Sequence, residues 1–178
     1  MKSIAVFCGS SSGANPIYAE VAVALGKYLV EHNRRLIYGG GNVGLMGVIA
    51  DSVLESGGEV IGVIPGFLMD KEVGHTGLTE LIIVDTMHQR KQKMCELADA
   101  FITLPGGFGS MDELFEILTW KQLGLHNKFI GVLNSNSYYD NLNALINHMN
   151  GEQFVSDKTM ELIVIRDNIK ELFEKMNR

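Results

Sequence analysis

The sequence predicts a Rossmann-like, doubly wound α/β domain, with one mostly parallel sheet and helices on both of its faces. Short apolar, β-branched runs alternate with longer segments of helical period, and this alternation is typical of parallel sheets covered on both sides. Glycine clusters follow several of the runs directly, and ligand-binding loops in such folds follow the strands. A length of 178 residues favours a single domain, residues 1–178.

The expected strands are the apolar runs themselves. They are residues 4–8, 36–38, 60–64, 81–84, 101–104, 129–133 and 162–165. The first helix has Asn15 as its N-cap and Pro16 at its first position, and it ends near Asn33. The second helix, residues 44–56, stops at a Gly-Gly pair.

Capping signals also predict the later helices. Thr86 followed by Gln89 has the spacing of a capping box, and Ser110 followed by Glu113 repeats it at the start of a fourth helix. Residues 138–149 and 168–176 supply two more helices. We expect the segment after residue 151 to add a strand and a helix that close the domain.

Composition narrows the class of function. The 15 Lys and Arg residues against 21 Asp and Glu residues give a net charge of −6, so neither a nucleic acid nor a membrane is the expected partner. No apolar run approaches the ~20 residues that span a bilayer, and the N-terminus does not resemble a signal peptide. The sequence therefore predicts a soluble, cytoplasmic protein. Cys8 and Cys95 are expected to be free, buried thiols.

The 20 glycines concentrate after the first, second and fifth expected strands. The second cluster, residues 39–44, fits G-x-G-x-x-G after a strand and before a helix, which suggests a dinucleotide site. The acidic residue expected at the end of the next strand is missing. A phosphate-binding P-loop is excluded because no Gly-Lys-Ser/Thr occurs. Three such loops at one end of a sheet still indicate a ligand.

The loop at residues 104–113 is the most informative. Its backbone N–H groups, at the start of a helix, can receive a phosphate. Ser110 can cap that helix or contact the phosphate. Glu113 has two interpretations: the acid of a capping box, or a carboxylate placed beside a bound sugar.

Arg90 falls within the apolar stripe of the third expected helix. A guanidinium on that side needs an anionic partner or must reach the surface. Arg90 and Lys91 could face the same crevice as the glycine loops, where a phosphate suits the planar guanidinium. The five His residues show no metal-binding spacing, and we expect no metal and no cofactor.

These segments together resemble the LOG (Lonely Guy) family, the cytokinin riboside 5′-monophosphate phosphoribohydrolases, long labelled as lysine decarboxylases. The motifs that carry the resemblance are Tyr-Gly-Gly-Gly-x-x-Gly-Leu-Met-Gly at 38–47, Met-His-x-Arg-Lys at 87–91, and Pro-Gly-Gly-x-Gly-Thr-x-x-Glu at 105–113. Two departures are small: Ser110 stands for the Thr of that signature, and Asp112 for a common Glu.

The resemblance implies hydrolysis of the N-glycosidic bond of a nucleoside 5′-monophosphate, releasing the free base and ribose 5-phosphate. It implies that Arg90 and Glu113 are catalytic, in a homodimer whose subunits complete each other's sites. The residues it implies in substrate binding are Gly39, Gly40, Gly41, Glu72, Met87, Lys91, Gly106, Gly107, Phe108, Gly109, Ser110, Met111, Asp112 and Thr119.

Other functions remain open at this stage. A non-catalytic nucleotide-binding module would use the same loops, with Glu113 only capping its helix. A pyridoxal-phosphate decarboxylase would need a Schiff-base lysine with tuning partners, and nothing marks Lys91 for that role. Residues 66–79 form the expected wall around the base, with His75 among them. They do not decide between a prenylated adenine nucleotide and plain AMP.

Overall fold

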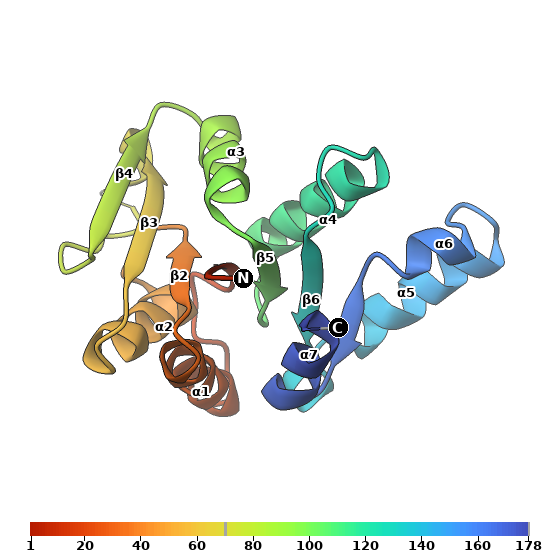
Figure 1. The fold of residues 1–178 in the computed structure, drawn as a ribbon, viewed down its shortest axis with the longest axis horizontal. Coiled ribbons are helices and arrows are strands. Elements are labelled where there is room, and N and C mark those ends of the chain that lie inside the picture. The colour runs from red at the N-terminus through yellow and green to blue at the C-terminus, as the bar shows by residue number, and fades with distance from the viewer. Residues whose placement is uncertain (70, 178) are drawn as a thin grey trace.

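The computed structural model describes residues 1–69 and 71–177, so residue 70, within the expected base wall, and residue 178 lie outside the described residues. Seven strands alternate with helices along these residues (Figure 1). The strands are β1 (Ser3–Phe7), β2 (Arg35–Tyr38), β3 (Val60–Pro65), β4 (Glu80–Val84), β5 (Ala100–Thr103), β6 (Phe129–Leu133) and β7 (Val164–Arg166). Every expected strand is therefore present, the last displaced by two residues at its start.

The helices follow the strands in turn. They are α1 (Ile17–Glu31), α2 (Gly44–Glu55), α3 (Met87–Leu97), α4 (Phe108–Gln122), α5 (Asp140–Gly151), α6 (Asp157–Met160) and α7 (Ile169–Met176), with two 3₁₀ turns, η1 (Gly66–Leu68) and η2 (Ser135–Ser137). Helix α5 begins two residues later than the sequence predicts, after η2. The short α6, not expected from the sequence, lies between α5 and β7.

The capping box predicted for α3 is present, whereas α1 begins one residue later than predicted, with Pro16 and not Asn15 as its N-cap. Asn15 Oδ1 accepts a hydrogen bond from the Ile17 backbone N–H at 3.1 Å. Thr86 and Gln89 form the complete capping box of α3. Gly57, which follows α2, has a φ of +80°, the left-handed conformation that ends helices. Local sequence signals therefore set these boundaries.

The strands form one sheet in the order β4-β3-β2-β1-β5-β6-β7, and all its pairings are parallel. The direction of growth reverses between β1 and β5, which pair directly, with Phe7 opposite Thr103. This reversal confirms the doubly wound topology and places a crevice at the carboxyl ends of these two strands.

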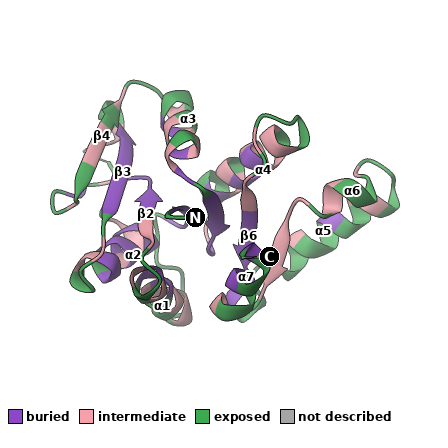
Figure 2. Cartoon of the chain, viewed as in Figure 1, coloured by how far each residue is buried: buried purple, intermediate pink, exposed green. Residues whose placement is uncertain are grey.

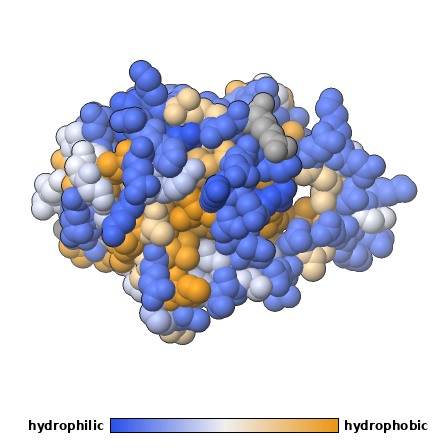
Figure 3. Space-filling model, turned by 60° about the horizontal axis from the view of Figure 1, so that its bottom comes forward, coloured by the Kyte–Doolittle hydropathy of each residue, from blue (hydrophilic) through white to orange (hydrophobic). Residues whose placement is uncertain are grey.

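Successive side chains of the strands enter two separate cores. Ile4 and Val6 pack with α1, α2 and α7 on one face, whereas Ala5 and Phe7 pack with α3, α4 and the start of α5 on the other. Figure 1 shows α1, α2 and α7 below the sheet and α3 and α4 above it, and the central strands are the most continuously buried elements (Figure 2). On the side that faces down in Figure 1, hydrophobic residues gather near the centre and hydrophilic residues surround them (Figure 3).

Candidate active site

Loops that follow β1, β2 and β5 meet at one end of the sheet. Gly9 donates its N–H to the Pro105 carbonyl at 3.1 Å, and Leu45 donates to the Gly9 carbonyl at 3.0 Å. Gly44, with a φ of +56°, lies so close to the first loop that a Cβ on it would approach the Ser10 carbonyl carbon to 2.3 Å. The clustered glycines thus serve close approach between loops as well as turning.

A cleft of about 220 Å³ opens between these loops. Its walls are contributed by the loops after β1 and β5, by Leu45 at the start of α2, and by two tyrosines, Tyr18 and Tyr138. The Tyr138 hydroxyl donates to the Gly106 carbonyl at 2.7 Å, and the two tyrosine rings meet edge to face at 5.6 Å. Tyr138 therefore fixes the loop that the sequence identifies as most informative, a role that sequence analysis missed.

Arg90 is buried, with 4% of its surface exposed. Two of its three guanidinium nitrogens, Nε and Nη2, donate to oxygen atoms of the chain. Nε donates to the Val63 carbonyl at 3.0 Å. Nη2 donates to the Gly39 carbonyl at 2.7 Å and forms an ion pair with Glu72 Oε2 at 3.0 Å. The sulfur of Met87 lies 3.9 Å from Nη1. The predicted anionic partner of Arg90 is thus a carboxylate of this chain.

Three consecutive glycines after β2 make room for this arrangement. Gly39 lies against the Arg90 guanidinium, and Gly40 has a φ of +77°, which favours glycine. A Cβ on Gly41 would come within 3.0 Å of the Glu72 Cβ. The glycines of this motif, which has the spacing of a dinucleotide fingerprint, therefore leave the space that Arg90 and its partner Glu72 occupy.

The capping box predicted for α4 is wrong. Helix α4 begins at Phe108, its N-cap is Gly107, and no side chain caps it. Ser110 is the third helical residue and buried, and its side chain occupies the space beside Gly106, where a Cβ would lie 2.1 Å from Ser110 Oγ. This close packing lets the helix start directly after the two glycines, so Glu113 falls in the second turn and does not cap the helix.

Glu113 is a perturbed carboxyl group in this helix. Its pKa is raised to about 7: burial is the largest cause, the nearby Arg90 charge opposes it, and the charges of Glu72 and Asp112 act in the same direction as burial. Within the described residues, Arg90 forms its ion pair with Glu72 and none with Glu113. A carboxyl with a pKa near 7 suits acid–base chemistry at neutral pH.

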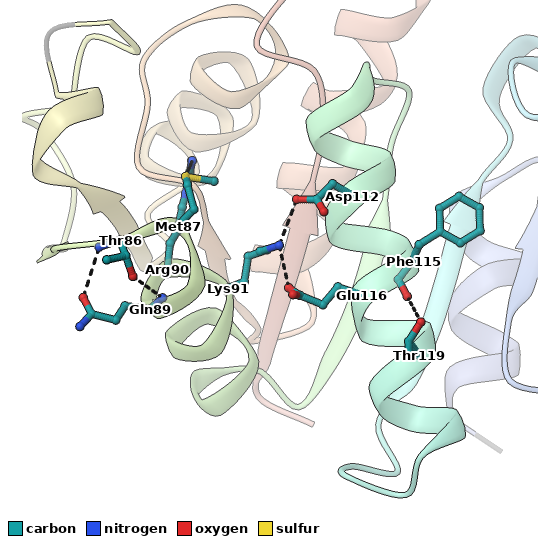
Figure 4. A network of polar contacts seen from close by, with 9 residues as sticks. All are labelled: Thr86, Met87, Gln89, Arg90, Lys91, Asp112, Phe115, Glu116 and Thr119. Carbon is teal, nitrogen blue, oxygen red and sulfur yellow. Dashed lines mark hydrogen bonds and ion pairs between the residues drawn. The ribbon is translucent and has the colours of Figure 1, made fainter.

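Lys91 connects α3 to α4 (Figure 4). Its Nζ lies 3.1 Å from Asp112 Oδ2 and 3.1 Å from Glu116 Oε2. Partial burial lowers the pKa of Lys91, but the hydrogen bonds to Asp112 and Glu116 outweigh it, so the pKa lies above its usual value. Sequence analysis missed Glu116, although the four-residue spacing from Asp112 places both carboxylates on one helix face.

The side chains of two residues that the resemblance implies in substrate binding make no hydrogen bond or ion pair with this cluster. Phe108 is 96% exposed at the start of α4. Thr119 donates its hydroxyl to the Phe115 carbonyl at 2.7 Å (Figure 4), and it lies less than two turns along α4 from Glu113, or roughly 9 Å along the axis. The single chain therefore gathers Arg90, Glu113, Lys91, Asp112 and Glu72, but not the side chains of these two.

Other sequence expectations concern thiols, metals and membranes. Cys8 is free and buried, as predicted, whereas the free Cys95 is only half-buried. In the part of the chain that the structure describes, no group of His, Cys, Asp and Glu residues could hold a metal ion. Over residues 1–69 and 71–177, no helix is long and apolar enough to cross a bilayer.

The fold and the site together define a doubly wound α/β protein with a glycine-lined cleft and a carboxyl group of raised pKa beside a buried arginine. A family model described as "Possible lysine decarboxylase" matches residues 46–176. The chain is 47% identical over 175 residues to the cytokinin riboside 5′-monophosphate phosphoribohydrolase LOG7 of Arabidopsis thaliana, with 98% of this chain and 81% of the relative covered. The chain therefore belongs to the LOG family, as its motifs indicate.

A bacterial relative gives the same result. The cytokinin riboside 5′-monophosphate phosphoribohydrolase of Rhodococcoides fascians is 47% identical over 170 residues, covering 95% of this chain and 86% of the relative. Among solved structures, the molybdenum cofactor carrier protein of Chlamydomonas reinhardtii superposes with a TM-score of 0.74 at 18% identity, covering 99% of this chain and 96% of that one. The latter likeness shows the shared fold.

Proposed function

We propose that this chain hydrolyses the N-glycosidic bond of a nucleoside 5′-monophosphate, as its relatives' names describe for cytokinin riboside 5′-monophosphates. The base leaves C1′ of the ribose, water adds its oxygen there, and ribose 5-phosphate is the second product. The single observation that carries the proposal is Glu113, a carboxyl with a pKa of about 7 on the helix that begins at the glycine-rich loop.

Glu113 has two tasks in this reaction. The transition state resembles a ribosyl oxocarbenium ion, so an ionised carboxylate beside C1′ stabilises its positive charge. The same carboxylate orients water and accepts its proton as the C1′–O bond forms. The base leaves with the electron pair of the C1′–N bond, and the proton taken from water balances the one that the free base gains. A pKa of about 7 makes it a stronger base than an ordinary glutamate while leaving much of it ionised at neutral pH.

The phosphate anchors the substrate. Gly107, Phe108 and Gly109 form the start of α4, where backbone N–H groups without helical partners and the helix dipole attract an anion. Binding energy from this remote group positions C1′ at Glu113. Arg90 stands beside the sugar subsite, held by Gly39, Val63 and Glu72, so it can supply a fixed positive field.

A decarboxylase that uses lysine as a Schiff-base nucleophile fits this site poorly. Such a lysine must lose its proton, which happens when burial or a neighbouring cation lowers its pKa. At Lys91 the carboxylates of Asp112 and Glu116 raise the pKa instead. The charge arrangement supports an ammonium ion that joins two helices.

We further infer that the chain acts as a homodimer in which α4 of each subunit serves the other's site. An apolar groove of about 200 Å³ runs between α4 and the α5–β7 region, lined by Phe115, Leu118 and Thr119 among others. Phe115 remains 38% exposed. A second subunit would cover such side chains and bring Thr119 to a substrate that it does not reach within its own chain.

The deciding experiment incubates the purified protein with AMP and, separately, with a prenylated AMP, and quantifies free base and ribose 5-phosphate. We expect equimolar products from at least one nucleotide, and the ratio of kcat/KM values identifies the preferred base. Glu113→Gln should lower turnover by about 10²–10⁴-fold while nucleotide binding persists. The absence of base release from any nucleoside monophosphate would refute hydrolysis and favour a binding module.

A further inference from the structure

The segment that carries Glu72 is bound to the second glycine loop through its backbone. Asn42 donates its N–H to the carbonyls of Glu72 and Val73, each at 2.9 Å, and His75 donates its N–H to the Gly40 carbonyl at 2.9 Å. Gly41 and Gly74 form an antiparallel bridge between the two segments. The position of the Glu72 carboxylate is therefore set by how residues 72–75 lie on the loop 40–42.

This segment is held in a strained conformation. Val73 has a φ of +47°, and left-handed backbone is unfavourable for a β-branched residue. Val73 is also 54% exposed, so burial of its side chain does not explain the conformation. Contacts on either side of Val73 must maintain it, and the side chain of His75 makes one of them.

His75 links the segment to helix α2. Its ring is buried, with Nε2 at 2.9 Å from Asp51 Oδ1 and Nδ1 at 3.1 Å from the Gly77 N–H. A backbone N–H can only donate, so Nδ1 accepts and Nε2 carries the proton that is donated to Asp51. Both ring nitrogens of His75 are thus used in contacts within the chain. Asp51 lies on α2, the helix that starts directly after the glycine loop.

We propose that His75 and Asp51 are positioning residues, which lock residues 72–75 onto the glycine loop and so keep the Glu72 carboxylate on Arg90. The chain of contacts is continuous: Asp51 holds the His75 ring, His75 and Asn42 hold the strained turn, and Glu72 Oε2 lies 3.0 Å from Arg90 Nη2. The kinetic part of this proposal rests on the proposed function, whereas the structural link does not.

Loss of the link has a specific consequence for Arg90. Arg90 is 4% exposed, and Glu72 is its one ion-pair partner among the described residues. A released turn removes that partner, so the guanidinium shifts toward the remaining carboxylate at the site, Glu113. Because catalysis depends on placement to within about an ångström, such a shift lowers kcat more than it changes KM.

A double-mutant cycle tests the link. We expect His75→Ala to lower kcat by roughly 10–100-fold in the natural sequence, and by less than about twofold in a Glu72→Gln background, where no carboxylate remains to be positioned. His75→Gln keeps a donor near Asp51, and Asp51→Asn keeps the acceptor. Each variant should therefore retain most of the activity that His75→Ala loses. His148→Ala, at an exposed histidine on α5, is the matched control and should leave kcat unchanged.

Hydrogen exchange separates failure of the link from failure of the proposed function. The Asn42 amide, which is bonded to the Glu72 and Val73 carbonyls, should exchange at least tenfold faster in His75→Ala than in the natural chain. Unchanged exchange, or an equal loss of kcat in both backgrounds, would overturn the proposal. If the natural chain releases no base, the proposed function fails and the exchange rate alone decides whether His75 holds the turn.

Discussion

Nη2 of Arg90 lies 2.7 Å from the carbonyl oxygen of Gly39, and a Cβ atom on Gly39 would lie 2.0 Å from the same nitrogen. The guanidinium therefore occupies the place of a side chain that residue 39 does not have. Backbone flexibility does not explain this glycine, because no positive φ is found there. The first glycine of the 39–44 motif is required by the arginine, and the motif is explained without a dinucleotide.

Gly39→Ala should displace Arg90 and lower kcat by about 10²-fold or more, since the new methyl group and Nη2 cannot share one position. The measurement is steady-state base release, with circular dichroism to verify folding. Gly151→Ala is the matched control, because a Cβ there meets nothing within 4 Å, and it should retain full activity. Near-normal turnover of the Gly39 variant would show that the position of Arg90 is unimportant.

Most of the fold is encoded in local patterns. The strands were predictable because each is a short apolar run bordered by polar or glycine residues. The last strand starts late because the Leu162 N–H bonds to the Thr159 carbonyl at 3.1 Å, which draws Leu162 into the turn after α6. That competing turn has no signal in the apolar pattern, so the run 162–165 extends beyond the paired strand at its N-terminal end.

The candidate site was predictable only in part. The place of Arg90 within an apolar stripe was enough to require an anionic partner, but the identity of that partner was not predictable. Glu72 comes from an irregular turn 18 residues earlier, and only the tertiary contacts of that turn aim it at Arg90. The sequence predicted the start of α4 wrongly because Ser110 fits a capping signal. In the structure, Ser110 packs closely against Gly106 and lies inside the helix.

The ionisation of Glu113 should control the pH dependence of the reaction. If the carboxylate is the active form, kcat/KM rises about tenfold per pH unit below a midpoint near pH 7, the pKa that burial gives Glu113, and levels off above it. The measurement is kcat/KM from pH 5 to pH 9 with a nucleotide that the protein hydrolyses. A midpoint near 4.5, the ordinary glutamate value, would contradict a buried base.

Glu113 should also destabilise the protein at the pH where it is most active. Its folded-state pKa is raised from 4.5 to about 7, so the unfolded chain loses this proton first, and the free energy of unfolding falls as pH rises from about 4.5 to 7. Glu113→Gln should therefore raise the stability at pH 8 by on the order of 1–2 kcal/mol, with little effect at pH 4. Denaturant unfolding at both pH values measures this; a destabilised variant at pH 8 would count against it.

The contact of Lys91 with two carboxylates should matter more than an ordinary surface ion pair. Glu116→Gln leaves Lys91 with Asp112 alone and should lower stability by roughly 0.5–1 kcal/mol and kcat several-fold, as the spacing of α3 and α4 relaxes. The Lys93–Glu96 pair, at 3.7 Å and with both side chains more than 40% exposed, offers the control. Glu96→Gln should change neither quantity; equal effects of the two substitutions would mean that Lys91 holds nothing at the site.

The apolar groove beside α4 should be the contact between two subunits. Phe115 lines it and is 38% exposed, and Thr119 lies one turn further along the same helix. Phe115→Lys places a charge where a second copy would bury an aromatic ring, so it should shift the mass measured by light scattering from two chains to one and abolish base release. Leu145→Lys alters a residue of similar exposure, 47%, on α5 and outside the groove-lining set, so it should leave both the dimer and the activity intact.

If the Phe115 variant remained a fully active dimer, the contact would have to lie elsewhere and Thr119 would have no route to the site. A monomeric variant that kept full activity would show that each chain carries a complete site, which makes activity and mass together the decisive pair of measurements.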